Sequence, residues 1–371
     1  MFGFLNRFFH GNENLVGLDI GSHNVKAVEL RENRKGGLFL ENLAMHPLPA
    51  ETIVDGAVMN SSNIVETIGR IWDQYRIKNK NVAISLSGTS VITKYLDLPA
   101  QSDEELASSI IHEMHYSNLI PFEIEDVRWD YCPMETGVDG ARGVIIAVAK
   151  QDVIGDYESS VREAGLNVQV IDLDCFAIQN IFERVGSGGG FDSNENTIFV
   201  NVGASKVNMS IVSGNGTPKF TRDVGGAGNY LTNEIVKLLN VGFDEAESLK
   251  VGGQQEEGEA DSMIPEAVSK IMAQAVDSVI MEIKRTLEFR SAISLIDSSN
   301  AKIYLTGGSA QIPMFPKLLS EKSNLAVEIF NPFQDVGFDQ KKFAADDLAK
   351  YAPFFSVAMG LALRRIGDID R

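Results

Sequence analysis

The chain has 371 residues, of which 44% are apolar and 23% charged, and its formal net charge is −18 at pH 7. This length and composition indicate a globular protein with more than one domain. The negative charge argues against a nucleic-acid partner, because nucleic-acid binding depends on basic contacts to phosphates. Cys132 and Cys175 lack metal-ligand spacing and are typical of structural thiols in a cytosolic protein. No apolar run reaches the length of a membrane span and no signal peptide is visible.

The first ninety residues alternate between strand and helix patterns. The aromatic stretch at 1–10 either forms an amphipathic foot for a membrane or partner, or packs back on the fold. Apolar positions at helical spacing predict a helix over 62–76, capped by Ser61 or Ser62. Strands are predicted at 15–21, 25–31, 38–46 and 81–88, the first three as a meander.

Residues 100–167 change character and predict a separate unit. The stretch "SDEELASSIIHEMHYSNL" predicts a capped helix, strands follow at 127–135 and 143–150, and a second helix is predicted over 151–165. This order of elements predicts an inserted α/β subdomain of about 75 residues, which is within the usual size of a domain.

A second meander lies between two stretches that predict exposed loops, at 186–196 and 252–261. Its sequence repeats the start of the chain, because "GLDIGSHNVKAVEL" (17–30) and "FVNVGASKVNMSIV" (199–212) align without a gap. Asp19 then corresponds to Asn201 and Gly21 to Gly203. A chance likeness of two hydrophobic hairpins is one interpretation. The other is a pair of similar lobes whose glycine turns line one cleft.

The first glycine turn is suited to an anion and a metal ion. The main-chain amides of Ser22, His23 and Asn24, which follow Gly21, can point into one concavity. Lys26 adds a cation, and Asp19 can hold the waters of a magnesium ion. For His23 alone, a surface or hydrogen-bonded side chain is a better interpretation than a catalytic base.

The second turn offers the amides of Ala204 and Ser205 after Gly203, but Asn201 is neutral where its repeat partner Asp19 is acidic. An amide oxygen can still receive a metal-bound water, although it cannot act as a base or neutralise the cation. We therefore expect that binding survives this difference better than turnover does.

Two glycine pairs and one charged pair are candidates for the same cleft. Gly225–Gly226 and Gly307–Gly308 each precede a predicted helix, where amides can meet an anion or a purine edge, although each alone also fits a plain turn. Glu247 and Lys250 lie three residues apart on one helical face. They either bracket a ribose or form a surface ion pair.

The order of these motifs resembles the actin-like ATPase superfamily. Its two phosphate turns, its first connecting helix, its adenosine motif and its second connecting helix are similar here to "GLDIGSHNVK", "VNVGASK", "IDLDCFAIQNIF", "YLTGGSAQIP" and "PFFSVAMGLALRR". The likeness is closer to the PilM family, the FtsA-like proteins of type IV pilus assembly. It is carried by "VAISLSGTSVITKYLDLP", "DVGGAGNYLTNEI", "DEAESLKVGG", "TGGSAQIPMF" and "VAMGLALRR", which span nearly the whole chain.

The resemblance implies an α/β fold of the actin-like, ribonuclease H-like type with two lobes. The first lobe would comprise 1–92, completed by 168–190 and 340–371. An FtsA/PilM-type subdomain would be inserted at 93–167. The second lobe would comprise 197–339, with a smaller subdomain at 232–299.

The resemblance also implies that ATP and Mg²⁺ bind between the lobes. The nucleotide-binding residues would be Asp19, Gly21, Ser22, His23, Asn24, Lys26, Asn201, Gly203, Ala204, Ser205, Gly225, Gly226, Glu247, Lys250, Glu282, Arg285, Gly307 and Gly308. Asp19 would hold the metal through water. Asn201 departs from the acidic residue of many superfamily members, so we expect slow or no hydrolysis, and no residue is singled out as a general base.

For function, the resemblance implies a cytoplasmic adaptor that captures the N-terminal peptide of a PilN-like inner-membrane protein and meets other pilus assembly components. It would then associate with the cytoplasmic face of the inner membrane through that partner. Two alternatives stay open: an actin-fold small-molecule kinase or ATPase, and an FtsA-like filament-forming division protein.

Overall fold

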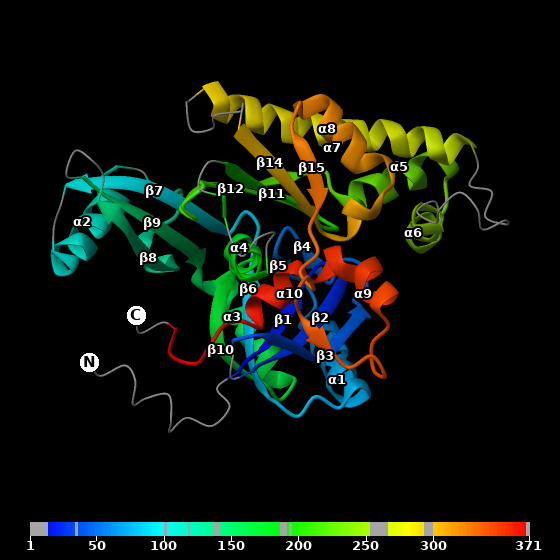
Figure 1. The fold of residues 1–371 in the computed structure, drawn as a ribbon, viewed down its shortest axis with the longest axis horizontal. Helices are drawn as coiled ribbons and strands as arrows, with labels where there is room; N and C mark the ends of the chain where they lie inside the picture. Colours follow the sequence, from blue (N-terminus) through cyan, green and yellow to red (C-terminus); the bar gives the residue numbers. More distant parts are fainter. Residues whose placement is uncertain are drawn as a thin grey trace.

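The computed structural model describes residues 14–33, 36–99, 102–117, 119–136, 141–185, 191–192, 195–252, 266–292 and 300–368. The aromatic stretch at 1–10 lies outside the described residues, as do most of the loops predicted at 186–196 and 252–261. The described chain forms two large sheets that lie one above the other, with a smaller three-stranded sheet to one side (Figure 1). A two-stranded sheet is formed by β4 (Ile53–Val54) and β5 (Ala57–Val58).

The lower sheet has the strand order β10-β6-β1-β2-β3-β16. The predicted meander is confirmed, because β1 pairs antiparallel with β2, and β2 with β3. On its other side, β1 pairs in parallel with β6. The strands are β1 (Val16–Ile20), β2 (Asn24–Glu32), β3 (Leu38–Pro47), β6 (Asn81–Leu86), β10 (Asn167–Leu173) and β16 (Gly337–Phe338).

The upper sheet repeats this arrangement with the order β13-β12-β11-β14-β15. Again the first strand, β11, has an antiparallel neighbour in β12 and a parallel neighbour in β14. The strands are β11 (Asn196–Val202), β12 (Lys206–Val212), β13 (Pro218–Gly225), β14 (Ala301–Thr306) and β15 (Ala326–Ile329).

The internal repeat is confirmed down to the register of the hairpins. Asp19 pairs with Lys26 in the first hairpin, and Asn201 pairs with Asn208 at the equivalent place in the second. Each turn is closed by one main-chain bond, from the Gly21 amide to the Asn24 carbonyl at 3.1 Å and from the Gly203 amide to the Lys206 carbonyl at 3.0 Å. Since a slip of one residue would invert every side chain, this agreement excludes a chance likeness.

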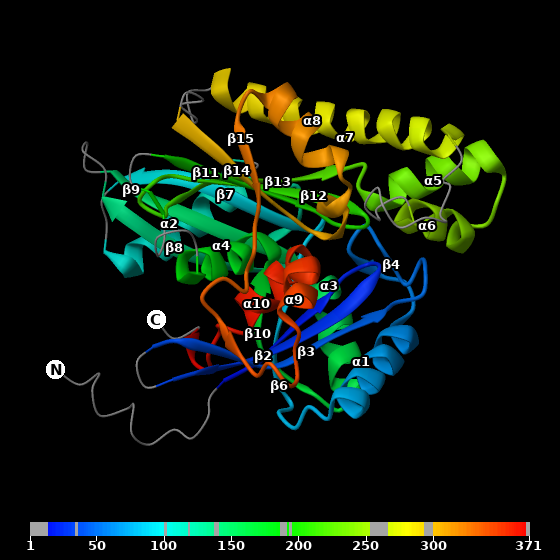
Figure 2. The same cartoon turned by 45° about the vertical axis from the view of Figure 1, so that its right-hand side comes forward.

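Helices cover the outer faces of both sheets, as Figure 2 shows. The predicted helix at 62–76 is α1, but its cap is Asn60, whose side chain accepts the amide of Asn63, and not Ser61 or Ser62. The described α-helices other than α2 of the inserted subdomain are α1 (Ser61–Tyr75), α3 (Gln151–Glu163), α4 (Asp174–Val185), α5 (Gly228–Leu239), α6 (Phe243–Gly252), α7 (Glu266–Ala292), α8 (Met314–Ser323), α9 (Ala345–Tyr351) and α10 (Ser356–Leu361). Short 3₁₀ helices are η2 (Ile124–Asp126), η4 (Gly308–Gln311) and η5 (Ala352–Phe355). None of the helices within these described ranges is long and apolar enough to cross a membrane.

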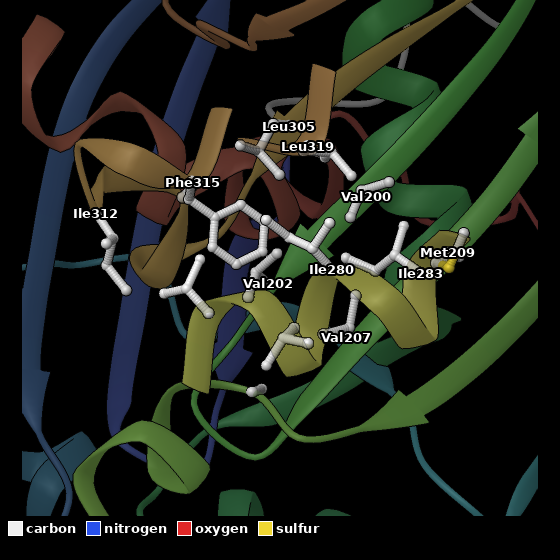
Figure 3. Packing of buried hydrophobic residues seen from close by; sticks show 14 of the residues in the cluster. Val200, Val202, Val207, Met209, Ile280, Ile283, Leu305, Ile312, Phe315 and Leu319 are labelled. Atoms are coloured by element: carbon white, nitrogen blue, oxygen red, sulfur yellow. The ribbon is translucent and has the colours of Figure 1, made fainter. Parts of the chain in front are cut away.

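The upper lobe is held by an apolar layer between its sheet and the helices α7 and α8. Figure 3 shows Ile280 and Ile283 of α7 facing the strand residues Val200 and Val207, with Phe315 of α8 beside them. These side chains are fully buried. Burial of this kind is the main favourable contribution to folding, so α7 is an integral part of the lobe.

The helices α4 and α10 lie between the two sheets and pack against each other (Figures 1 and 2). Their contact depends on glycine, because a methyl group at Gly360 would collide with the main-chain carbonyl of Ala177 in α4. On the neighbouring strand β1, a methyl group at Gly17 would collide with the carbonyl of Ala358 in α10. The backbones therefore approach to a distance that no other residue allows at these two positions.

The three-stranded sheet is the core of the inserted subdomain. It has the order β7-β9-β8, and the helix α2 covers it with the buried side chains of Leu106 and Ile110. A capping box between Ser102 and Glu105 begins this helix, as the sequence predicted for its start. The elements are β7 (Val91–Pro99), α2 (Asp103–Tyr116), β8 (Val127–Thr136) and β9 (Ala141–Lys150).

The helix α3, which the sequence-based division placed in the inserted subdomain, packs instead within the core of the lower lobe. Its buried Val153, Tyr157 and Val161 join Ile64 and Ile68 of α1. The subdomain sheet meets the upper lobe through a hydrogen bond between the hydroxyls of Thr93 on β7 and Thr221 on β13.

Gly360→Ala should lower the free energy of unfolding by about 1–3 kcal/mol, because the added methyl group overpacks the contact between α4 and α10. The matched control is Gly69→Ala in α1, where an added methyl group has no neighbour within 4 Å. That control should leave stability unchanged or raise it by up to about 1 kcal/mol. Urea unfolding of both variants checks this, and equal stability of the two would contradict the close contact.

Candidate functional site

A cleft of about 320 Å³ lies between the two lobes, with both glycine turns in its lining. Fourteen of the residues predicted from the sequence line it. They are Asp19, Gly21, Ser22, His23, Asn24, Lys26, Asn201, Gly203, Ala204, Ser205, Glu247, Lys250, Gly307 and Gly308. The repeat therefore brings together two distant parts of the chain in one site.

The two glycine turns face each other across the cleft and touch. The Ser22 hydroxyl donates to the Ser205 hydroxyl at 3.1 Å. Within the described chain, the main-chain amides of Ser22, His23, Ala204 and Ser205 have no hydrogen-bond acceptor. A main-chain amide that is shielded from water and has no acceptor costs free energy. These turns are therefore suited to an anion with several oxygens.

Asp19 and Lys26 form an ion pair on the floor of the cleft, with 2.7 Å between Oδ2 and Nζ. Their side chains are 11% and 13% exposed, so the two charges neutralise each other at a place with little water. In the upper lobe the same register position holds Asn201 opposite Asn208. At this register position the second lobe therefore lacks both the carboxylate and the lysine, so neither charge is left there without a partner.

Sequence reasoning missed Asp174, the first residue of α4, which also lines the cleft. Its Oδ1 accepts the Ser85 hydroxyl at 2.6 Å. Desolvation by burial, supported by the negative charge of Asp19, raises the pKa of Asp174 to about 7, against the opposing bonds from Ser85 and Ser87. An acidic residue where a helix follows a strand, inside "IDLDCFAIQNIF", was the available signal.

A second missed group joins the upper lobe to the lower one. Asp223 on β13 accepts the Asn208 side-chain amide at 2.6 Å and the Gly88 main-chain amide at 2.5 Å. Lys206, the first residue of β12, reaches the main-chain carbonyl of Asp55 at 2.9 Å. All of these except Asp55 and Gly88 line the cleft. A lysine directly after the second turn was the signal in the sequence.

Glu247 and Lys250 are not a surface ion pair, and that interpretation is wrong. Lys250 is only 6% exposed. Its Nζ lies 2.6 Å from Glu247 Oε2 and donates to the Thr232 hydroxyl at 2.9 Å and the Gly228 carbonyl at 3.2 Å. Burial lowers the pKa of Lys250, and Glu247 opposes this shift. The pair joins α6 to α5 and presents Glu247 to the cleft.

His23 links the first turn to this pair. Its Nε2 lies 4.0 Å from Glu247 Oε1. Burial lowers the pKa of His23, assisted by the positive charges of Lys250 and Lys26 and opposed by Glu247. The imidazole is therefore neutral at pH 7, where it can offer a hydrogen bond from one ring nitrogen.

The far side of the cleft, at Gly307 and Gly308, is apolar. Gly307 has a φ of +91°, and a methyl group there would lie 2.6 Å from Asn201 Oδ1. A methyl group at Gly308 would lie 2.7 Å from the ring of Phe354. Phe354, Pro353 and Val251 supply the apolar lining. Glycine at these two positions therefore lets the main chain pack directly against Asn201 and the Phe354 ring.

Four predicted residues are not brought into the cleft. Glu282 and Arg285 form an ion pair on α7, with side chains 45% and 74% exposed, and are absent from the cleft lining. Gly225 and Gly226 end β13 and lead into α5. The residues after them bond to the second turn, through the Gly228 amide to the Gly203 carbonyl at 3.1 Å. The segment that follows this glycine pair therefore supports the turn.

The residues present fit a nucleotide with a divalent cation. The part of the chain that the structure describes contains no cluster of three or more His, Cys, Asp or Glu side chains that could hold a metal ion by itself. Magnesium commonly binds through one or two carboxylates together with substrate phosphates and waters. Asp19 beside the free amides offers that combination, with the phosphates supplying the remaining oxygens.

Comparison with known proteins agrees with this architecture. The family model described as "Type IV pilus assembly protein PilM" matches residues 17–366. Among curated proteins, the cell division protein FtsA of Streptococcus pneumoniae is 22% identical over 369 residues, covering 89% of this chain and 78% of FtsA.

Two solved structures show the same fold. One is a PilM–PilN type IV pilus biogenesis complex, with a TM-score of 0.81 and 24% identity over 95% of this chain and 98% of that one. The other is the ethanolamine utilization protein EutJ from Carboxydothermus hydrogenoformans, with a TM-score of 0.54 and 13% identity over 94% and 89%. The predicted actin-like fold is confirmed.

Asp174 should make the protein less stable as the pH rises from about 4 to about 7. In this range the unfolded chain loses the Asp174 proton, while the folded protein, in which the pKa is about 7, keeps it. Asp174→Asn removes this effect, and asparagine can still accept the Ser85 hydroxyl. Thermal unfolding at pH 4.5 and pH 8 should show the variant gaining stability relative to wild type at the higher pH. Parallel profiles would contradict the raised pKa.

Proposed function

Because this chain belongs to the family of the type IV pilus assembly protein PilM, we propose that it is an ATP-binding adaptor of the pilus assembly machinery. In this function it binds Mg²⁺-ATP between its lobes and captures the N-terminal tail of a PilN-like inner-membrane protein. The observation that supports it best is the pair of glycine turns with identical register, which face each other at Ser22 and Ser205.

Phosphate binding is assigned to the free amides of the two turns, with Gly21 and Gly203 allowing close approach. The charges of the lining support a need for the cation. Among the lysines that line the described cleft, Lys26 and Lys250 are already paired with Asp19 and Glu247, and Lys206 has only a neutral acceptor. The protein therefore offers a triphosphate little unpaired positive charge, and a magnesium ion held by Asp19 through water would supply more.

The nucleoside is assigned to the opposite end of the cleft. Glu247 is the side chain suited to the ribose hydroxyls, since a carboxylate accepts two hydrogen bonds. Lys250 holds Glu247 in place. The purine would lie along Gly307 and Gly308, where Phe354 offers an aromatic surface.

Slow or absent hydrolysis follows from the neutral second turn. The position equivalent to Asp19 is Asn201, which cannot take a proton from water. Asp174, with a pKa of about 7, could exchange a proton at neutral pH, so the slow rate is assigned to the neutral second turn alone.

Partner capture is assigned to the side of the molecule that carries the inserted subdomain. The structurally similar PilM protein was solved as a complex with PilN. By analogy, an extended tail would bind beside the β7-β9-β8 sheet and hold this protein at the cytoplasmic face of the inner membrane, where it would meet other assembly components. ATP would favour the peptide-binding arrangement of the lobes through its higher affinity for that arrangement.

The first experiment is to identify the nucleotide that the purified protein retains. The protein is incubated with magnesium and ATP, desalted and denatured, and the released nucleotide is identified. Intact ATP near one per chain supports a nucleotide-loaded adaptor. Steady release of phosphate would favour an ATPase or kinase, and the absence of nucleotide, with and without the PilN-type peptide, would reject the proposal.

Asp19→Ala should weaken Mg²⁺-ATP binding on the order of 10- to 100-fold, because it removes the metal-facing carboxylate and leaves Lys26 unpaired. Capture of a PilN-type peptide should weaken with it. Glu66→Ala is the matched control, since Glu66 forms an exposed ion pair with Arg70 on α1. Calorimetry with ATP and with the peptide checks both effects, and undiminished peptide capture by a nucleotide-free variant would separate the two functions.

Asn201→Asp should raise the rate of ATP hydrolysis on the order of tenfold, because it returns an acidic group to the second turn. The structure suggests a companion variant, Asn201→Asp with Asn208→Lys, which rebuilds the charge pair seen at Asp19 and Lys26. Phosphate release at saturating ATP is the measurement. No increase in either variant would show that this neutral position does not limit turnover.

A further inference from the structure

The side chain of Lys206 extends from the second glycine turn to the lower lobe, where its ammonium group bonds to a neutral acceptor. It follows the second glycine turn directly, yet its Nζ donates to the main-chain carbonyl of Asp55 in the lower lobe at 2.9 Å. No carboxylate of the described chain lies within ion-pair distance of this ammonium. The other two cleft lysines, Lys26 and Lys250, each have a carboxylate partner.

This environment leaves the ammonium with unused capacity. A lysine ammonium has three N–H donors, and the structure gives Lys206 one acceptor. Burial lowers the pKa of Lys206, and the more distant carboxylates of Asp223, Asp55 and Asp174 oppose that shift. The free amides of Ala204 and Ser205 precede it in the chain. Together these groups are suited to phosphate oxygens, for which charged hydrogen bonds are stronger than neutral ones.

The acceptor belongs to a tight turn of the lower lobe. Asp55 and Gly56 form the two-residue turn between β4 (Ile53–Val54) and β5 (Ala57–Val58), with φ values of +52° and +87°. Positive φ values at both central residues are typical of a two-residue hairpin turn. It packs on the residues after β6, since a methyl group at Gly56 would lie 2.6 Å from the Ser87 carbonyl. At Gly88, a methyl group would collide with the Lys206 ammonium.

The turn at Asp55–Gly56 packs on Ser87 and Gly88, which form the root of the inserted subdomain. They are its root because β7, the first strand of the subdomain, begins three residues after Gly88. The upper lobe holds the root at two further points. Asp223 accepts the Gly88 amide at 2.5 Å, and the Thr221 hydroxyl bonds that of Thr93. In the part of the chain that the structure describes, the side chains of Lys206, Asp223 and Thr221 hydrogen-bond from the upper lobe to this region, and Lys206 directly follows the Gly203–Ser205 turn.

We propose that Lys206 hydrogen-bonds to the phosphates of a bound nucleoside di- or triphosphate and thereby couples phosphate binding to the inserted subdomain. This inference rests on the proposed nucleotide site. A phosphate on the Gly203–Ser205 turn is a charged acceptor within the same cleft. The ammonium exchanges the Asp55 carbonyl for a phosphate oxygen. The region around the subdomain root then loses its hydrogen bond from Lys206 to the upper lobe. Adenosine, which has no phosphate, leaves the Asp55 bond in place.

The first test compares Lys206→Met with Lys219→Met, which removes the same charge from an exposed position on β13 of the same sheet. Calorimetry is carried out with magnesium and either ATP or adenosine. Lys206→Met should lose ATP affinity on the order of tenfold and keep its adenosine affinity. Lys219→Met should match wild type, and Lys206→Arg should retain the preference for ATP. Unchanged ATP affinity of Lys206→Met would overturn the inference.

The second test measures the coupling by hydrogen exchange, first in wild type and then in Lys206→Met. Hydrogen exchange of the Gly88 amide and the start of β7 should become faster when ATP with magnesium is added to wild type, and should not change with adenosine. In Lys206→Met this response to ATP should be absent. ATP binding without faster exchange in wild type would overturn the coupling alone, whereas failure of wild type to bind any nucleotide would overturn the proposed function and this inference with it.

Discussion

The close approach of α4 to α10 is the contact on which the rest of the structure depends. At Gly360 the two helices come so near that a single methyl group would meet the Ala177 carbonyl, and at Gly17 the strand β1 approaches α10 in the same way. The buried cluster around these helices contains Val28 and Ala83 from the lower sheet and Phe199 and Tyr304 from the upper. One apolar cluster therefore joins both lobes and sets the distance between them.

That distance determines what the glycine turns can do. Each turn is built locally, by a hairpin register and one main-chain bond. They become a site only because the lobes bring Ser22 and Ser205 to 3.1 Å. The free amides on both sides then surround one volume, and His23 and Lys206 reach across it to the opposite lobe.

The two turns are alike in backbone and different in charge. Asp19 opposite Lys26 corresponds to Asn201 opposite Asn208. Loss of the acid alone would have left a buried lysine without a partner, which is costly in a desolvated place. At this register position the second lobe has neither charge, so its turn keeps its stability and its amides without an acidic group at Asn201. In the proposed function, this difference would let the protein hold phosphates and cleave them slowly.

The sequence by itself determined the elements and the repeat, because apolar periodicity and glycine turns depend on near neighbours. It indicated fourteen of the lining residues, and it placed Asn201 over Asp19 without a structure. Only the tertiary structure decided that Glu247 and Lys250 are buried, that Glu282 and Arg285 point to solvent, and that α3 belongs to the lower core. It alone showed Asp174, Asp223 and Lys206 at the cleft. The burial and the partners of these side chains arise from segments far apart in the chain, and no local pattern carries that information.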